Sequence, residues 1–417
     1  MSYIVVGNSA AGLFAVEEIR KRDTQAEIIV LTAEQEPSYS RCLTTYFLAG
    51  DIPASRLYLR EEGFTERLNL NVVYGVEVNQ IAPERQVVKS SDGREWGYSK
   101  LLLAMGASAK KLTIPGGSLP EVFTLRTMND ALAINTVLER GVKKAVVIGG
   151  GLVSLKSAYA LRKRGLEVTV LISSGQLLSQ MLDKKAGDLI QERLSAHGVK
   201  FLLQTGASAV TGTDHVRGVL IEGPTELEAD LVIVGKGVRP NIGNLRDFGF
   251  NIGYGIQVDS SLATNIPNVY AAGDIAETWD LVRQTFAVNA TWPNATTQGR
   301  LAGANMCGGQ EVYPGSLGLN SVDFFGLSAM SAGITKLPEN KEQGDWKQEE
   351  SQKPAEDRPI YRSLIWLGDI LKGFILVGDT SQCGVLTALV KAGRPLTEAQ
   401  KNLAMGKRGT LAVAMMK

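Results

Sequence analysis

The sequence predicts an α/β fold with two Rossmann-like, three-layer (ββα) dinucleotide-binding domains and a C-terminal α+β domain. Glycine-rich turns follow apolar strand patterns in residues 3–12 (YIVVGNSAAG) and 146–160 (VVIGGGLVSLKSAYA), and each turn leads into a helical pattern. After residue 313 the apolar residues take on strand periodicity. Two dinucleotide turns in one chain indicate two dinucleotides that exchange electrons.

The composition narrows the class of protein. A chain of 417 residues with 44% hydrophobic residues is expected to form two or three domains. The 44 Lys and Arg residues balance 43 Asp and Glu residues, which argues against nucleic acid or an anionic membrane as a partner. Cys42, Cys307 and Cys383 are far apart, so we expect no disulfide framework and no metal or iron–sulfur site held by this chain. With no signal peptide and no membrane-spanning run in the sequence, we expect a cytoplasmic protein.

The first βαβ unit is predicted in residues 3–34. Its second strand ends near Glu34, which lies 22 residues after Gly12. A carboxylate at about this distance from the turn typically binds an adenosine ribose. The alternative is a solvated glutamate at a strand end. Residues 37–50 (PSYSRCLTTYFLAG) should then pass the pyrophosphate side of the site, and residues 71–103 predict a β-meander.

The second βαβ unit follows a helix predicted over residues 126–140. Ser154 takes the third position of the glycine motif and is small enough for close packing of helix and strand. The strand that follows ends in Ile172, Ser173 and Ser174, which provide neither a carboxylate for a ribose nor an arginine for a 2′-phosphate. The missing cation favours NAD over NADP.

Later segments complete the predicted domains. A buried strand over residues 230–234 leads into GKGVRPN, and residues 264–274 (TNIPNVYAAGD) deliver Asp274, a candidate ligand of a flavin ribityl chain or else a turn aspartate. A helix is predicted over residues 287–306, and its N-terminal amides would face a flavin ring.

The C-terminal part predicts a mainly β domain. The expected strands are residues 320–325, 329–334, 361–367 and 374–377, and helices are expected from about residues 383 and 397. Between the middle strands, residues 339–358 are densely charged. We favour a solvated hairpin insertion there over a docking loop for a partner.

Taken in order, these motifs resemble a known family. Over roughly residues 3–334, their order is that of the FAD-dependent pyridine nucleotide-disulphide oxidoreductases. The motifs are the first glycine turn, Glu34, PSYSRCL, AMGA, the second glycine turn, GVRPN and VYAAGD. The YSR and WPNATTQGRLAGANMCGG segments resemble the nitrite-reductase and ferredoxin- or rubredoxin-reductase branch. The VGNSAAGLFAVEE and GGGLVSLK runs are similar to the flavin subunits of 2-oxoacid (phenylglyoxylate) dehydrogenases.

The resemblance implies an FAD domain formed by residues 1–112 and 241–310, an inserted NAD domain over residues 113–240, and an interface domain over residues 311–417. The implied FAD ligands are Gly7, Ser9, Ala10, Ala11, Gly12, Glu34, Arg41, Cys42, Ala104, Gly106, Gly273, Asp274 and Trp292. The implied NAD ligands are Gly149, Gly151, Leu152, Val153, Ser154 and Gly237.

Two positions bear on the chemistry. Many relatives pair a lysine and a glutamate beside the flavin, at the positions of Tyr46 and Lys156 here. Lys156 is therefore a candidate catalytic cation that stabilises reduced flavin, with a solvated helix lysine as the alternative. A dithiol relay would need a second cysteine five residues after Cys42, and that position is occupied by Phe47. Single-cysteine relatives place a redox thiol in this segment, so Cys42 is either a catalytic thiol or a bystander.

The leading hypothesis is an FAD-dependent oxidoreductase that passes electrons between iron–sulfur (ferredoxin-type) subunits and NAD(H), within a 2-oxoacid (phenylglyoxylate) dehydrogenase complex. The iron–sulfur partner must be a separate polypeptide because this chain lacks cluster cysteines. The alternative is a stand-alone, homodimeric NADH-dependent thiol, disulfide or peroxide reductase that uses Cys42. A third hypothesis is a flavin-binding scaffold without turnover.

Overall fold

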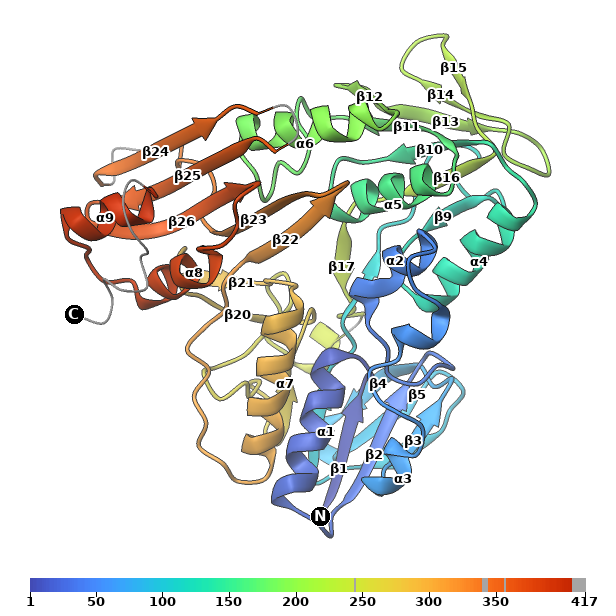
Figure 1. Cartoon of the computed structure of the whole chain (residues 1–417). Coiled ribbons are helices and arrows are strands. Elements are labelled where there is room, and N and C mark those ends of the chain that lie inside the picture. Colours follow the sequence, from blue (N-terminus) through green and yellow to red (C-terminus); the bar gives the residue numbers. More distant parts are fainter. Residues whose placement is uncertain (244, 340–343, 356–357, 407–417) are drawn as a thin grey trace. The chain divides into compact units, whose positions relative to one another are not determined.

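The computed structural model describes the chain except for residues 244, 340–343, 356–357 and 407–417. The chain divides into two compact units (Figure 1). Unit 1 comprises Met1–Thr44, Ile52–Ser108 and Val238–Ser316. Unit 2 comprises Thr45–Asp51, Ala109–Gly237 and Leu317–Lys417.

Unit 1 is organised around a five-stranded parallel sheet. Its strand order is β19-β7-β1-β2-β3. The strands are β1 (Ser2–Val6), β2 (Glu27–Thr32), β3 (Asn71–Tyr74), β7 (Lys100–Leu103) and β19 (Val269–Ala271). Short apolar runs such as Ile4–Val5 are fully buried, as expected for strands covered on both faces. The predicted meander over residues 71–103 is wrong at its ends, because β3 and β7 belong to this parallel sheet.

Two helices of unit 1 pack together unusually closely. Helices α1 (Ala10–Arg22) and α7 (Trp292–Met306) lie side by side (Figure 1). A Cβ atom added at Gly299 would lie 2.2 Å from the carbonyl oxygen of Ala11, and one at Gly303 would lie 2.6 Å from that of Ala15. The helices therefore meet backbone to backbone. The predicted helix over residues 287–306 starts later, at Trp292, because Ala287 belongs to β21 (Thr285–Ala287) and residues 288–291 form no regular structure.

Smaller elements complete unit 1. An antiparallel sheet of β4 (Val78–Ala82), β5 (Val87–Ser90) and β6 (Glu95–Gly97) supplies Ile81 and Val88 to the same core as the parallel sheet. Together with the helices this confirms the predicted three-layer arrangement. The described residues of unit 1 also contain α3 (Phe64–Arg67), β8 (Ala107–Ala109), β17 (Val238–Pro240), β18 (Ile256–Gln257), β20 (Ala276–Asp280) and four short 3-10 helices.

Unit 2 contains a second five-stranded parallel sheet with the order β12-β11-β10-β16-β9. Its strands are β9 (Val122–Thr124), β10 (Lys144–Ile148), β11 (Glu167–Ile172), β12 (Val199–Leu203) and β16 (Leu231–Val234). Its helices are α4 (Met128–Glu139), α5 (Leu152–Lys163) and α6 (Lys184–Ala196). A third layer comes from β13 (Ala207–Thr211), β14 (Gly218–Ile221) and β15 (Glu226–Glu228). The fold class predicted for the second dinucleotide turn is confirmed.

The C-terminal part of unit 2 is an antiparallel sheet with helices. The strand order is β22-β23-β26-β25-β24, formed by β22 (Leu319–Phe324), β23 (Leu327–Gly333), β24 (Trp346–Lys353), β25 (Ile360–Leu367) and β26 (Ile370–Val377). Helices α8 (Cys383–Ala392) and α9 (Glu398–Ala404) follow. The charged segment supplies β24, an edge strand paired with β25, and its charges oppose further edge-to-edge pairing. The docking role, which was the less favoured hypothesis for this segment, is tested by no contact within the described residues.

A buried carboxylate fastens α6 to this antiparallel sheet. The side chain of Asp183 accepts hydrogen bonds from the backbone amide of Ala186 at 2.9 Å and from the Tyr361 hydroxyl at 2.6 Å. Asp183 therefore caps the helix and fixes it to β25 at once. Among the described helices, none combines the length and the apolar character needed to cross a bilayer.

Candidate active site

The first glycine turn connects β1 to α1 in unit 1. Gly7 has φ +114°, and a Cβ atom there would lie 2.2 Å from the carbonyl oxygen of Ala104. A Cβ atom on Gly12 would lie 1.9 Å from the carbonyl oxygen of Gly7. Both glycines are thus required by close packing. Ser9 precedes the helix without a side-chain cap, so the amides of the first helical turn remain available to an anion.

Three strand ends meet at this turn. Because β19, β7 and β1 are parallel neighbours, the residues after them share the carboxyl edge of the sheet. The amide of Ala104 donates to the Val6 carbonyl at 2.8 Å, and a Cβ atom on Gly273 would lie 3.2 Å from the Cβ of Ala11. The structure therefore brings together the predicted residues Gly7, Ser9, Ala10, Ala11, Gly12, Ala104, Gly106, Gly273 and Asp274. Trp292 is the half-buried first residue of α7.

The predicted ribose ligand Glu34 lies just after β2 and is bound by its neighbours. The Tyr39 hydroxyl donates to the carboxylate at 2.6 Å, and Arg41 forms an ion pair with it. The Arg41 guanidinium also lies over the Tyr39 ring, 5.3 Å from its centroid. The reading of Glu34 as a freely solvated residue is therefore wrong. Cys42 follows Arg41 in a short 3-10 turn, and its side chain is exposed.

The second glycine turn connects β10 to α5 in unit 2. Gly149 has φ +121°, and a Cβ atom on it would lie 2.4 Å from the Gly235 carbonyl oxygen. A Cβ atom on Gly150 would lie 2.8 Å from the side chain of Ile172. Ser154 is fully buried, and its hydroxyl donates to the Gly235 carbonyl at 3.2 Å. Serine thus replaces the third motif glycine and donates a hydrogen bond to the residue that follows β16.

The outer side of this turn is open. A Cβ atom on Gly151 would meet no atom within 4 Å. Leu152 and Val153 are 37% and 40% exposed, which is unusual for apolar residues at the start of a helix. The turn therefore presents free amides beside an apolar surface, a combination that suits the phosphates and the ring of a dinucleotide. Ser173 and Ser174, at the end of β11, are exposed.

Lys156 lies one turn further along α5 and is only 8% exposed. Its ammonium is 4.4 Å from the centroid of the Tyr46 ring and 3.3 Å from the Asp323 carbonyl oxygen. The Tyr159 and Phe324 rings also flank it. The alternative of a solvated helix lysine is wrong. Among the described residues no carboxylate neutralises this charge, which is held by the face and the hydroxyl of Tyr46 and by a carbonyl oxygen.

A family model with the description "Pyridine nucleotide-disulphide oxidoreductase" matches residues 1–299. The chain belongs to this family. Members bind FAD and NAD(H), so the predicted cofactors and the predicted class, an FAD-dependent NAD(H) oxidoreductase, are confirmed.

Individual relatives agree with this assignment. The chain is 34% identical over 342 residues to subunit epsilon of the NADH-dependent phenylglyoxylate dehydrogenase of Aromatoleum evansii, covering 82% of this chain and 81% of that protein. It is 32% identical over 353 residues to an NADH oxidase of Methanocaldococcus jannaschii, covering 81% and 79%. The solved NAD-dependent persulfide reductase from A. fulgidus has a TM-score of 0.90 at 29% identity, covering 100% of this chain and 83% of that one.

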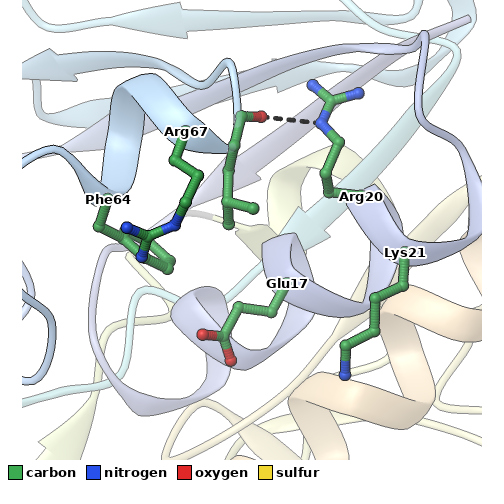
Figure 2. Close-up of a pocket in the computed structure, with 6 residues that line it drawn as sticks. Glu17, Arg20, Lys21, Phe64 and Arg67 are labelled. Atoms are coloured by element: carbon green, nitrogen blue, oxygen red, sulfur yellow. Dashed lines mark hydrogen bonds between the residues drawn. The ribbon is translucent and has the colours of Figure 1, made fainter.

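Unit 1 of this oxidoreductase also has a small pocket at the end of α1 opposite the first glycine turn. Its volume is about 360 Å³, and it is lined by Glu17, Arg20, Lys21, Phe64, Arg67 and Leu68 (Figure 2). Arg20 donates to the Leu68 carbonyl at 2.8 Å, shown by the dashed line, and to three further carbonyls. Glu17 pairs with Arg60 at 2.7 Å. Because these groups already have partners, and because Arg20 lies at the opposite end of α1 from the glycine turn, we do not assign a cofactor to this pocket.

Sequence reasoning missed the two glycines of α7 that set its contact with α1 in unit 1. Gly299 and Gly303 are four residues apart and face Ala11 and Ala15 of α1, which are also four apart. This spacing of small residues along both helices was the available signal. It identifies a close helix contact directly behind the first glycine turn.

Proposed function

We propose that this oxidoreductase is the flavin subunit of a larger complex, where it passes electrons between iron–sulfur (ferredoxin-type) subunits and NAD(H). The observation that carries the proposal is the pair of glycine turns, one in each unit, each with available helix amides. The three scattered cysteines leave an iron–sulfur centre to another polypeptide. Similarity to a phenylglyoxylate dehydrogenase subunit supports a 2-oxoacid dehydrogenase as the complex.

Each predicted residue has a proposed task. The amides at Ser9–Gly12 and at Gly151–Ser154 bind the two pyrophosphates, and Glu34 holds a ribose, with Arg41 beside it. When bound, FAD supplies the exchange between two-electron and one-electron carriers. Lys156 contributes an uncompensated buried charge that favours the reduced flavin. The four-part domain division, the site residues as a set, and the cytoplasmic location belong to the same proposal.

A substitution at Gly151 tests the nucleotide site without disturbing the fold. Since a Cβ atom there meets nothing within 4 Å, Gly151→Val should fold, retain FAD and fail to bind NADH. Gly384→Val is the matched control, because its Cβ also meets nothing and it lies in α8. Binding of NADH is measured by titration, and FAD content by absorbance. Normal NADH binding by Gly151→Val would show that the turn is not the nucleotide site.

The second candidate function is a reductase of thiols, disulfides or peroxides that works through Cys42. It is favoured by the exposed thiol beside Arg41 and by the similarity to a persulfide reductase. Cys42→Ser separates the two functions, with Cys383→Ser as the control. If Cys42→Ser retains NADH:ferredoxin and NADH:dye activity and any thiol activity is unchanged, the second function is wrong.

Two further observations complete the test. Iron-containing subunits that co-purify with the native chain support the complex, whereas a clean homodimer favours the stand-alone reductase. Rapid bleaching of bound FAD by NADH would contradict a scaffold without turnover.

A further inference from the structure

Three lysines gather beside the second glycine turn in unit 2. Lys110, Lys111 and Lys236 are all exposed. The backbone amide of Lys110 donates to the Gly237 carbonyl at 3.0 Å, so the two segments run together. Within the part of the chain that the structure describes, none of the three ammonium groups has an ion pair or a side-chain hydrogen bond. The result is an uncompensated positive charge next to the second glycine turn.

The loop that carries Lys236 is fixed against the turn. The amide of Gly235 donates to the Ile148 carbonyl at 2.9 Å, and the Gly235 carbonyl accepts from the Ser154 hydroxyl at 3.2 Å. A Cβ atom on Gly235 would lie 2.0 Å from that hydroxyl oxygen. Gly237, with φ +84°, then turns the chain away. The backbone of Lys236 is therefore held next to the turn while its side chain is exposed.

The strand order tells which half of a dinucleotide Lys236 would meet. Strands β11 and β16 flank β10 on opposite sides. In this kind of fold the adenosine lies toward the end of the second strand, which is β11 here. The nicotinamide half must then extend toward the other neighbour, β16. Lys236 follows the last residue of β16 after a single glycine, so its charge lies on the nicotinamide side.

We propose that Lys236, supported by Lys110 and Lys111, makes this site bind NADH more tightly than NAD⁺. The inference rests on the dinucleotide site proposed above. The nicotinamide ring carries a positive charge only in NAD⁺, and reduction by two electrons and one proton removes it. A neighbouring ammonium therefore weakens the binding of the oxidised, positively charged ring and leaves the binding of the neutral, reduced ring unchanged. Neither residues 149–154 nor residues 235–241 contain a carboxylate that would offset the lysine.

The preference has a consequence for the direction of electron flow. A site that binds NADH more tightly than NAD⁺ raises the reduction potential of the bound couple, and a tenfold ratio of dissociation constants corresponds to about 30 mV. This favours delivery of electrons to NAD⁺ over oxidation of NADH. It gives the nucleotide side of the proposed complex a preferred direction.

The test measures the dissociation constants of NADH and NAD⁺ separately, by titration of the FAD-loaded protein. Lys236→Met should lower the ratio of the NAD⁺ constant to the NADH constant by about three- to tenfold, and the effect should weaken at high ionic strength. Lys236→Arg should keep the ratio. Lys200→Met is the matched control, because Lys200 is an exposed lysine near the amino end of β12 in the same sheet.

The possible outcomes separate this inference from the proposed site. An unchanged ratio in Lys236→Met, with both nucleotides still bound, overturns the inference, even if both constants rise together. If Gly151→Val binds both nucleotides normally, the site itself is misplaced and the inference falls with it. Should Lys236→Met fold poorly by circular dichroism, Lys236→Gln provides the same measurement, and an unchanged ratio there overturns the inference. An unchanged ratio in the double variant Lys110→Met/Lys111→Met overturns the supporting role of these two lysines.

Discussion

Replacement of Gly299 by alanine tests the contact behind the first glycine turn. Its Cβ atom would lie 2.2 Å from the Ala11 carbonyl oxygen, about 1 Å inside ordinary contact distance. The obstacle is backbone, so α1 and α7 must separate. Such overpacking costs about 1–3 kcal/mol, whereas alanine gains at most about 1 kcal/mol of helix propensity over glycine. We therefore expect net destabilisation of about 1–2 kcal/mol, and weaker FAD binding because Ala11 lies in the turn.

Thermal unfolding and the amount of FAD retained after gel filtration measure the effect. Gly384→Ala in α8 is the matched control, since its Cβ meets nothing within 4 Å. The control should leave the melting temperature unchanged or slightly raised, and it should leave the FAD content unchanged. If Gly299→Ala behaves like the control, the two helices are not packed backbone to backbone and the reasoning is refuted.

Three other substitutions test unit 2 and the flavin. Lys156→Gln should lower the reduction potential of bound FAD by roughly 20–40 mV, because a buried positive charge is lost; potentiometric titration checks this, and a potential equal to that of the wild type contradicts the proposed role. Burial raises the pKa of Glu121, but the hydrogen bonds from the His215 ring at 2.8 Å and from a backbone amide outweigh it and hold the pKa below its usual value of 4.5. The stability that this carboxylate contributes is therefore present above about pH 4.5 and is lost as the pH falls through the lowered pKa. On acidification below about pH 4.5 the melting temperature of Glu121→Gln should fall less than that of the wild type. An equal fall in both proteins would argue against a stabilising role of the Glu121 carboxylate. Asp183→Ala removes the cap of α6 and leaves the buried Tyr361 hydroxyl without its carboxylate acceptor. We therefore expect the free energy of unfolding, measured by chemical denaturation, to fall by about 2–4 kcal/mol. A fall of less than about 1 kcal/mol would contradict the role of Asp183 in joining α6 to β25.

The elements nearest the two turns were predictable because their signals are local. An apolar run of four or five residues, a glycine triplet and a helical pattern fix the βαβ units within a few adjacent residues. The C-terminal strands and helices were also found from periodicity, except β24 (Trp346–Lys353), which lies in the charged segment and was not predicted as a strand. The errors arose because the sequence pattern of a strand does not determine which strand it pairs with. Strands β3 and β7 were predicted to belong to a meander, whereas the structure places both in the parallel sheet.

The sequence by itself determined the two dinucleotide turns, the family and the absence of a charged ligand for a ribose or a 2′-phosphate in residues 172–174. Only the tertiary structure decided how the functional charges are compensated. Lys156 is held by Tyr46, 110 residues away, and by Asp323, 167 residues away, while Lys236 lies beside the turn and has no such partner among the described residues. Local patterns encode periodicity and backbone conformation. The burial and pairing of a charge depend on segments that meet only when the chain folds.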